Sequence, residues 1–341
     1  YWVMPGASAY DDNQICDGGI QPTAFHGTHV SGTAAGDGGT PSRPNAANYD
    51  LGDGMAPQAR ILFQDLGNDS SGCLAGEGGV PMWSQALAAG VRIHSNSYGS
   101  PYTGEYQARE AALDEFLWRN EDMLLVFAAG NAGALGISHP AHAKHPLTVG
   151  ALLHGNSTAA ASFTSLGPAS DGRIKPDLAA PGSIISSAQG NDNDTLPSPG
   201  ITGLFSGTSM ATPAVAGAAA LVSQYFDNGF YPSGLANPAD RLRASGPLLK
   251  AVLLNGTLAF DDTPGFDRGW GRVWLDNNLY FAGDDRQLRL WSLANDAGLG
   301  QGDFHEFQVQ VPGGSEFRAT LVWYDPAPLL LASQALVNDL D

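Results

Sequence analysis

Apolar residues occur along the chain in two alternating patterns up to about residue 283. Short, nearly continuous apolar runs predict strands that are buried on both faces. These runs are residues 60–64, 91–97, 123–129 and 147–152. Stretches with helical spacing lie between and after them, at residues 81–90, 105–120 and following Ser209. The alternation predicts a doubly wound α/β fold with three layers and a mostly parallel sheet.

The pattern changes near residue 284. Three stretches alternate in polarity like short strands, and turn residues separate them. They are residues 287–291, 304–311 and 316–323. We therefore predict two domains: an α/β domain at 1–283 and an all-β sandwich or jelly-roll domain at 284–341. Because so few strands would leave open sheet edges, we expect the second domain to be truncated.

Charge and composition exclude several classes of protein. The formal net charge of −18 argues against a nucleic-acid partner, which requires a basic surface. No run of about 18 apolar residues predicts a membrane span, and the first ten residues do not resemble a signal peptide. We expect Cys16 and Cys73 to be unpaired, because two thiols make no disulfide framework.

The sequence GTSMATP at 207–213 is the strongest chemical signal. A glycine turn that leads into a helix exposes the Ser209 hydroxyl and directs backbone N–H groups toward a developing oxyanion. A serine nucleophile also needs a neighbouring base. Taken alone, the motif favours a serine that merely caps a helix.

A second motif, HGTHVSG at 26–32, supplies a candidate base. His26 precedes a small-residue segment and is suited to proton transfer near neutral pH. A metal pair of His26 and His29 is the alternative, although no glutamate lies between them as in HExxH. The joint occurrence of His26 and Ser209 favours catalysis.

A third motif, AAGN at 128–131, ends a predicted strand. The Asn131 amide at this position can donate a hydrogen bond to an oxyanion. The alternative interpretation is a polar turn residue.

The three motifs, in the chain order HGTHVSG, AAGN and GTSMATP, resemble the subtilisin family of serine peptidases (subtilases). The resemblance covers roughly residues 20–283 and implies a serine endopeptidase with a subtilisin-like fold. It implies His26 as general base, Ser209 as nucleophile, and the Asn131 side chain and the Ser209 N–H as oxyanion donors. It further implies two substrate-binding segments. These are Ser97, Tyr98 and Gly99, which pair with the substrate backbone, and Ala128, Ala129 and Gly130, which line a specificity pocket.

Further segments resemble large bacterial alkaline subtilases with a C-terminal β-barrel or jelly-roll domain. They are GMAP at 54–57, HSNSYG at 94–99, DGRIKPD at 171–177, GWGRV at 269–273 and LVNDL at 336–340. The resemblance implies protein or peptide substrates, secretion, and structural calcium whose ligands the sequence does not identify. No cofactor is expected for the chemistry, and we expect a monomer without membrane or nucleic-acid partners.

The catalytic aspartate of the family does not match this chain. Subtilases carry it in a DTG or DSG motif after an early strand, and no such motif precedes His26. Asp11, Asp12 and Asp17 are the acidic candidates, with Asp12 as a displaced substitute. We expect the aspartate to lie upstream of the sequence. A catalytically inactive peptide-binding or adhesive module is therefore the alternative function. A lipase or esterase is disfavoured, because its GxSxG motif precedes the histidine.

Three histidines recur at i, i+3 spacing: His139, His142 and His145. The spacing suggests a metal site. Because Pro140 and Pro146 interrupt any helix there, we predict a surface loop instead.

Overall fold

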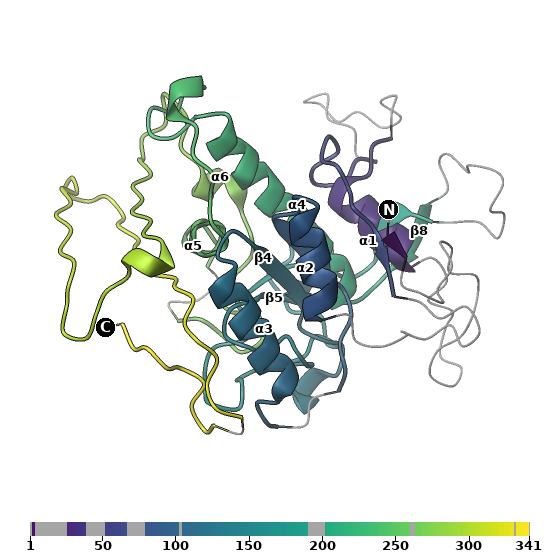
Figure 1. The fold of residues 1–341 in the computed structure, drawn as a ribbon. Coiled ribbons are helices and arrows are strands. Elements are labelled where there is room, and N and C mark those ends of the chain that lie inside the picture. The colour runs from purple at the N-terminus through teal and green to yellow at the C-terminus, as the bar shows by residue number, and fades with distance from the viewer. Residues whose placement is uncertain are drawn as a thin grey trace.

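A four-stranded parallel sheet forms the centre of the structure (Figure 1). The computed structural model describes residues 2–3, 26–38, 52–66, 79–101, 104–189, 202–259, 263–330 and 332–340. The sheet contains β3 (Ile93–Asn96), β4 (Leu124–Ala128), β5 (Leu147–Leu152) and β6 (Leu178–Pro181), in that order. Two small sheets complete the described strands. They are β1 (Trp2–Val3) beside β2 (Gln64–Asp65), and the antiparallel pair β7 (Ile185–Ala188) and β8 (Thr202–Phe205).

Helices cover both faces of the sheet. On one face, α2 (Val80–Ala88) and α3 (Ala108–Arg119) pack against Leu125 and Phe127 of β4. On the other face, α4 (Thr208–Asp227) and α5 (Gly246–Asn255) pack against Leu124 and Val126 of the same strand. Successive side chains of a strand point to opposite faces, so a continuous apolar run supplies both cores. The three-layer α/β fold is confirmed.

The helix α1 (His26–Ala35) packs against α4, and contacts near both ends set its direction. The His29 ring stacks on Phe205, with ring centroids 4.4 Å apart, just before α4 begins. Further along, Gly217 of α4 lies against the Ala34 carbonyl. The two helices therefore run in the same direction, and His26 and Ser209 lie at the same end of the pair.

The described chain agrees with most predicted elements. The predicted helices correspond to α2, α3 and α4, and the runs at 91–97, 123–129 and 147–152 contain β3, β4 and β5. The prediction of a strand at 60–64 is less accurate, because β2 begins only at Gln64. A four-residue helix, α6 (Leu275–Asn278), follows the α/β core.

The strands predicted after residue 284 differ from the structure. Residues 287–291, 304–311 and 316–323 form no strand in the structure, and most of their side chains are exposed. An alternating pattern makes a strand only where a neighbouring backbone supplies hydrogen bonds, and these segments have no strand beside them among the described residues. The β domain at 284–341 stays a prediction.

No helix in the described ranges has the length and hydropathy needed to cross a membrane.

Candidate active site

Ser209 is the second residue of α4, and its position follows from local sequence. Pro213, four residues later, has no N–H to donate to the Ser209 carbonyl. The Ser97 hydroxyl takes that role and donates to this carbonyl at 2.9 Å. In return, the Ser209 hydroxyl donates to the Ser97 carbonyl at 3.3 Å. The first turn of α4 is thereby fixed to the segment after β3, with the Ser209 side chain partly exposed.

Asn131 lies against the same helix N-terminus. Its Oδ1 accepts hydrogen bonds from the Thr208 N–H at 2.8 Å and from the Thr208 hydroxyl at 3.0 Å. A backbone N–H can only donate, so the amide oxygen must face Thr208 and the amide nitrogen must point elsewhere. The Ser209 N–H, in the first turn of α4, has no helical acceptor. Two hydrogen-bond donors that could bind an oxyanion, the Asn131 amide nitrogen and the Ser209 N–H, therefore lie at this site.

Thr208 is a site residue to which the sequence analysis gave no role. Its hydroxyl accepts from the Gly130 N–H at 3.1 Å while it donates to Asn131. It is fully buried and joins the loop after β4 to the start of α4. Its place in the GTSMATP motif was the available signal, but a neighbour 77 residues distant cannot be read from the sequence.

His26 begins α1 and is partly buried. Burial, together with the nearby His29, lowers the pKa of the His26 imidazole from 6.5 to about 4. No carboxylate of the described residues contributes to that shift. The residues Asp11, Asp12 and Asp17, like Cys16 and Cys73, lie outside the described part of the chain.

His29 has a structural role at the contact between α1 and the β7–β8 pair. Its Nε2 lies 3.0 Å from the Ile185 carbonyl and 3.1 Å from the Gly203 carbonyl. One N–H shared between carbonyls of β7 and β8 ties α1 to that hairpin. Burial lowers the His29 pKa, so the neutral ring is favoured.

The first predicted substrate-binding segment, Ser97–Gly99, begins beside Ser209, with Ser97 and Tyr98 partly buried and Gly99 exposed. The Tyr98 ring packs edge-on against Phe127, with centroids 5.8 Å apart. A Cβ on Gly99 would lie 2.8 Å from the His139 carbonyl, so glycine permits this close approach. The next residue, Ser100, exchanges two backbone hydrogen bonds with His139.

The second segment, Ala128–Gly130, mostly contacts other parts of the protein. Ala128 and Ala129 are buried, and the Ala129 N–H and C=O bond to Val149 and Ser138. Gly130 has a φ of 106°, which favours glycine, and a Cβ there would meet the Ser138 hydroxyl at 2.0 Å. These contacts fix the loop that presents Asn131. The substrate roles of both segments stay predictions.

The histidine loop differs from its prediction. His139, His142 and His145 are 2%, 0% and 3% exposed, so this segment is part of the core and not a surface loop. Pro140 and Pro146 do prevent a helix there, but the loop lies against α3, and its groups hydrogen-bond to the carboxylates of Glu110 and Asp114.

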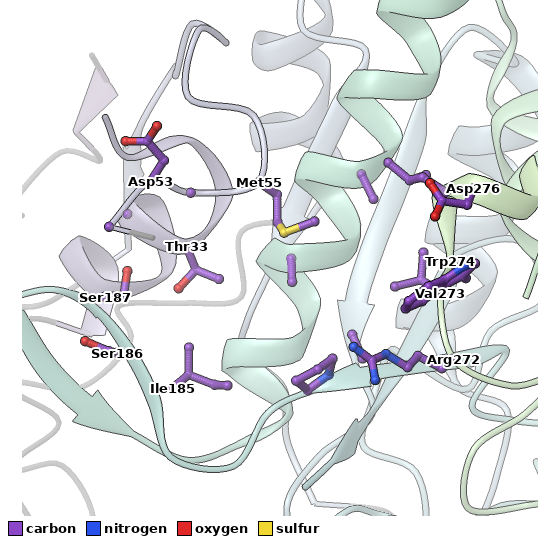
Figure 2. Close-up of a pocket in the computed structure, with 18 residues that line it drawn as sticks. Thr33, Asp53, Met55, Ile185, Ser186, Ser187, Arg272, Val273, Trp274 and Asp276 are labelled. Atoms are coloured by element: carbon purple, nitrogen blue, oxygen red, sulfur yellow. The ribbon is translucent and has the colours of Figure 1, made fainter. Parts of the chain in front are cut away.

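A cavity of about 430 Å³ lies beside α1 and α4 (Figure 2). Thr33 and Met55 line one side, Ile185 another, and Arg272 and Trp274 a third. None of the predicted catalytic or substrate-binding residues lines it. We therefore assign the cavity no part in the site around Ser209.

Comparison with known proteins places this arrangement in a family. The model of the subtilase family matches residues 10–271. The serine protease/ABC transporter B family protein tagD of Dictyostelium discoideum is 28% identical, over 98% of this chain and 25% of its own length. This chain spans about a quarter of that relative. Subtilisin BL of Lederbergia lenta is 36% identical, over 58% of this chain and 63% of its own. The structure of sphericase is similar, with a TM-score of 0.52 and 26% identity, covering 75% of this chain and 81% of that one. The chain belongs to the subtilase family of serine peptidases.

Proposed function

We propose that this chain is a serine endopeptidase that hydrolyses peptide bonds in proteins through an acyl-enzyme intermediate. The arrangement at the start of α4 carries the proposal. There the Ser209 hydroxyl is held by Ser97, and Asn131 is turned by Thr208 so that its amide nitrogen is available. Membership of the subtilase family supports the same reaction class.

In the first half of the reaction, the Ser209 Oγ attacks the peptide carbonyl carbon and His26 accepts the hydroxyl proton. The Asn131 amide and the Ser209 N–H stabilise the oxyanion. Collapse of this intermediate breaks the C–N bond, and His26 gives its proton to the leaving amine. Water then attacks the acyl ester, with His26 as base, and releases the carboxylic acid.

Substrate binding belongs to the same proposal. The backbone of Ser97–Gly99 receives the substrate as an added strand, and Ala128–Gly130 border the pocket for the residue before the cleaved bond. By family resemblance, the protein is a secreted monomer that acts on proteins or peptides and carries structural calcium. The acidic partner of His26 is supplied from outside the described residues.

A fluorophosphonate probe tests this function. The folded protein should be labelled at Ser209, as located by mass spectrometry, and should cleave casein at internal bonds. Ser209→Ala should lose labelling by about 10⁴-fold or more, because the nucleophile is gone. Ser223→Ala, on the same helix, is the matched control and should label normally.

The inactive-module alternative predicts the opposite result. It is supported by the His26 pKa, to which no described carboxylate contributes. Folded protein that neither labels nor cleaves, yet binds casein peptides, would establish the alternative and reject the peptidase.

A further inference from the structure

A second cluster of chemically active side chains lies on the α3 side of the sheet. Glu110 comes from the first turn of α3, and His139 and His142 come from the loop between β4 and β5. All three are buried, with exposures of 0%, 2% and 0%. One donor atom of each lies within 4.8 Å of a donor atom of the others. The proposed catalytic reaction uses none of them.

The three side chains converge on one carboxylate oxygen. Glu110 Oε1 lies 2.7 Å from His139 Nδ1 and 3.8 Å from His142 Nδ1. The two imidazole rings meet at 74°, with centroids 4.5 Å apart. The other oxygen, Glu110 Oε2, accepts the Gln107 N–H at 2.9 Å and so fixes the carboxylate plane. Metal sites commonly have such an outer hydrogen bond that orients a ligand.

The donor set is that of a zinc-class ion. Zinc holds imidazole nitrogens and carboxylate oxygens at about 2.0–2.2 Å, so neighbouring donors of a tetrahedral site lie about 3.4 Å apart. The observed separations of 2.7 and 3.8 Å bracket that value. Calcium does not fit, because it takes about six to eight oxygen ligands and this set has two nitrogens.

The positively charged side chains near this cluster are paired with carboxylates of their own. Arg173 donates to the His142 carbonyl at 2.9 Å, but its guanidinium is paired with Asp171 at 2.7 Å. Lys175 is likewise paired with Asp177 at 2.7 Å. A second buried carboxylate, Asp114, lies one turn after Glu110 on α3, where it accepts from the Tyr106 hydroxyl and from the backbone of Lys144 and His145. A metal ion at this cluster would place a positive charge beside the buried Glu110 carboxylate.

We propose that Glu110, His139 and His142 bind one divalent transition-metal ion of the zinc class. The ion ties the start of α3 to the loop between β4 and β5. That loop also carries Ser138, whose N–H bonds to the Ala129 carbonyl, and His139 pairs with Ser100. The metal therefore stabilises the backbone on which Gly130 and the Ser97–Gly99 segment rest.

The test uses the full chain without a polyhistidine tag. Protein loaded with Zn²⁺ and dialysed should retain one zinc per chain by mass spectrometry of the metal content. Glu110→Gln is nearly isosteric, still accepts the Gln107 N–H and loses the charged ligand. It should bind zinc more than about 100-fold more weakly, and His142→Gln should do the same. His154→Gln, which removes an exposed histidine, should bind like wild type.

The His26→Gln variant excludes zinc held at the proposed catalytic base, and it should also retain one zinc. Ser209→Ala should bind zinc normally, so failure of the proposed peptidase function leaves this test intact. Retention of less than about one-tenth of an equivalent by wild type, or equal retention by Glu110→Gln and His142→Gln, overturns the proposal. If a variant does not fold, Co²⁺ loaded into His26→Gln decides. An intense visible band of a four- or five-coordinate ion supports the site, and its absence overturns it.

Discussion

At the residue scale, the orientation of one amide group determines what the site around Ser209 can do. The Asn131 oxygen accepts two hydrogen bonds from Thr208, which leaves the amide nitrogen as a donor next to the proposed nucleophile, Ser209. A donor that is already positioned stabilises an oxyanion without reorganisation during the reaction. In the proposed reaction Thr208 is therefore a positioning residue, since it would act only through Asn131.

Replacing Asn131 by aspartate isolates this donor. Asn131→Asp retains acceptor oxygens for Thr208 but loses the N–H groups, and it adds a negative charge beside the oxyanion. We expect the second-order rate of fluorophosphonate labelling to fall by about 10²–10³-fold. Asn228→Asp, at the exposed far end of α4, is the control. Equal labelling rates in the two variants would remove Asn131 from the oxyanion site.

The pH dependence of labelling reports on His26. Labelling requires the neutral imidazole, and a pKa lowered to about 4 keeps it neutral down to that pH. With the described residues alone, the rate should therefore be constant above about pH 5 and fall about tenfold per unit below pH 4, and the proposed acidic partner of His26 should raise this midpoint. Circular dichroism at each pH separates this loss from acid unfolding. A midpoint at or above 6.5 would show that the proposed acidic partner faces His26, and a midpoint near 4 would contradict that partner.

At the scale of elements, close helix packing sets the relation between the two proposed catalytic groups. His26 begins α1 and Ser209 lies in the first turn of α4. Gly217 allows the two helices to approach, because a Cβ there would lie 2.5 Å from the Met55 Cβ and 2.7 Å from the Ala34 carbonyl. The glycine is needed for space and not for an unusual backbone angle.

Gly217→Ala tests this packing. The added methyl group meets backbone and side-chain atoms that have little room to move, so we expect a loss of about 1–3 kcal/mol in the free energy of unfolding. Urea unfolding measures it. Gly313→Ala is the control, because a Cβ there contacts nothing within 4 Å. Equal stability of the two variants would show that α1 and α4 can separate without cost.

At the scale of the whole molecule, a buried ion network joins the sheet to α5. Asp177, just before β6, accepts from Lys175 at 2.7 Å and pairs with Lys250 of α5 at 3.2 Å. It also accepts the Thr148 N–H of β5 at 2.7 Å. Burial by itself raises the Asp177 pKa, but the two ammonium groups outweigh it, and the pKa is lowered from 3.8. This contribution to stability is present above pH 3.8 and is lost as the pH falls below it.

Asp177→Asn removes the shared charge and leaves Lys175 and Lys250 buried without a carboxylate partner. We expect the free energy of unfolding at pH 7 to fall by about 3–5 kcal/mol in urea titrations. Asp227→Asn, exposed at the end of α4, should change it by less than about 0.5 kcal/mol. A similar small change for Asp177→Asn would mean that Lys175 and Lys250 need no carboxylate.

The sequence alone determined the elements and the chemical groups of the site, because both depend on local patterns. Continuous apolar runs predicted β3, β4 and β5, and short motifs indicated His26, Asn131 and Ser209 as candidate site residues. The same reasoning failed for the strands expected after residue 284, where the alternation is present but no neighbouring strand pairs with it.

The tertiary structure decided what partners each group has. The hydroxyl that satisfies the Ser209 carbonyl comes from Ser97, 112 residues away, and the oxygen that receives the Thr208 N–H lies 77 residues away. The prolines in the histidine loop correctly excluded a helix, but only packing against α3 buried His139 and His142 beside Glu110. A local pattern specifies the conformation of a segment, whereas burial and hydrogen-bond partners depend on segments that are distant in the sequence.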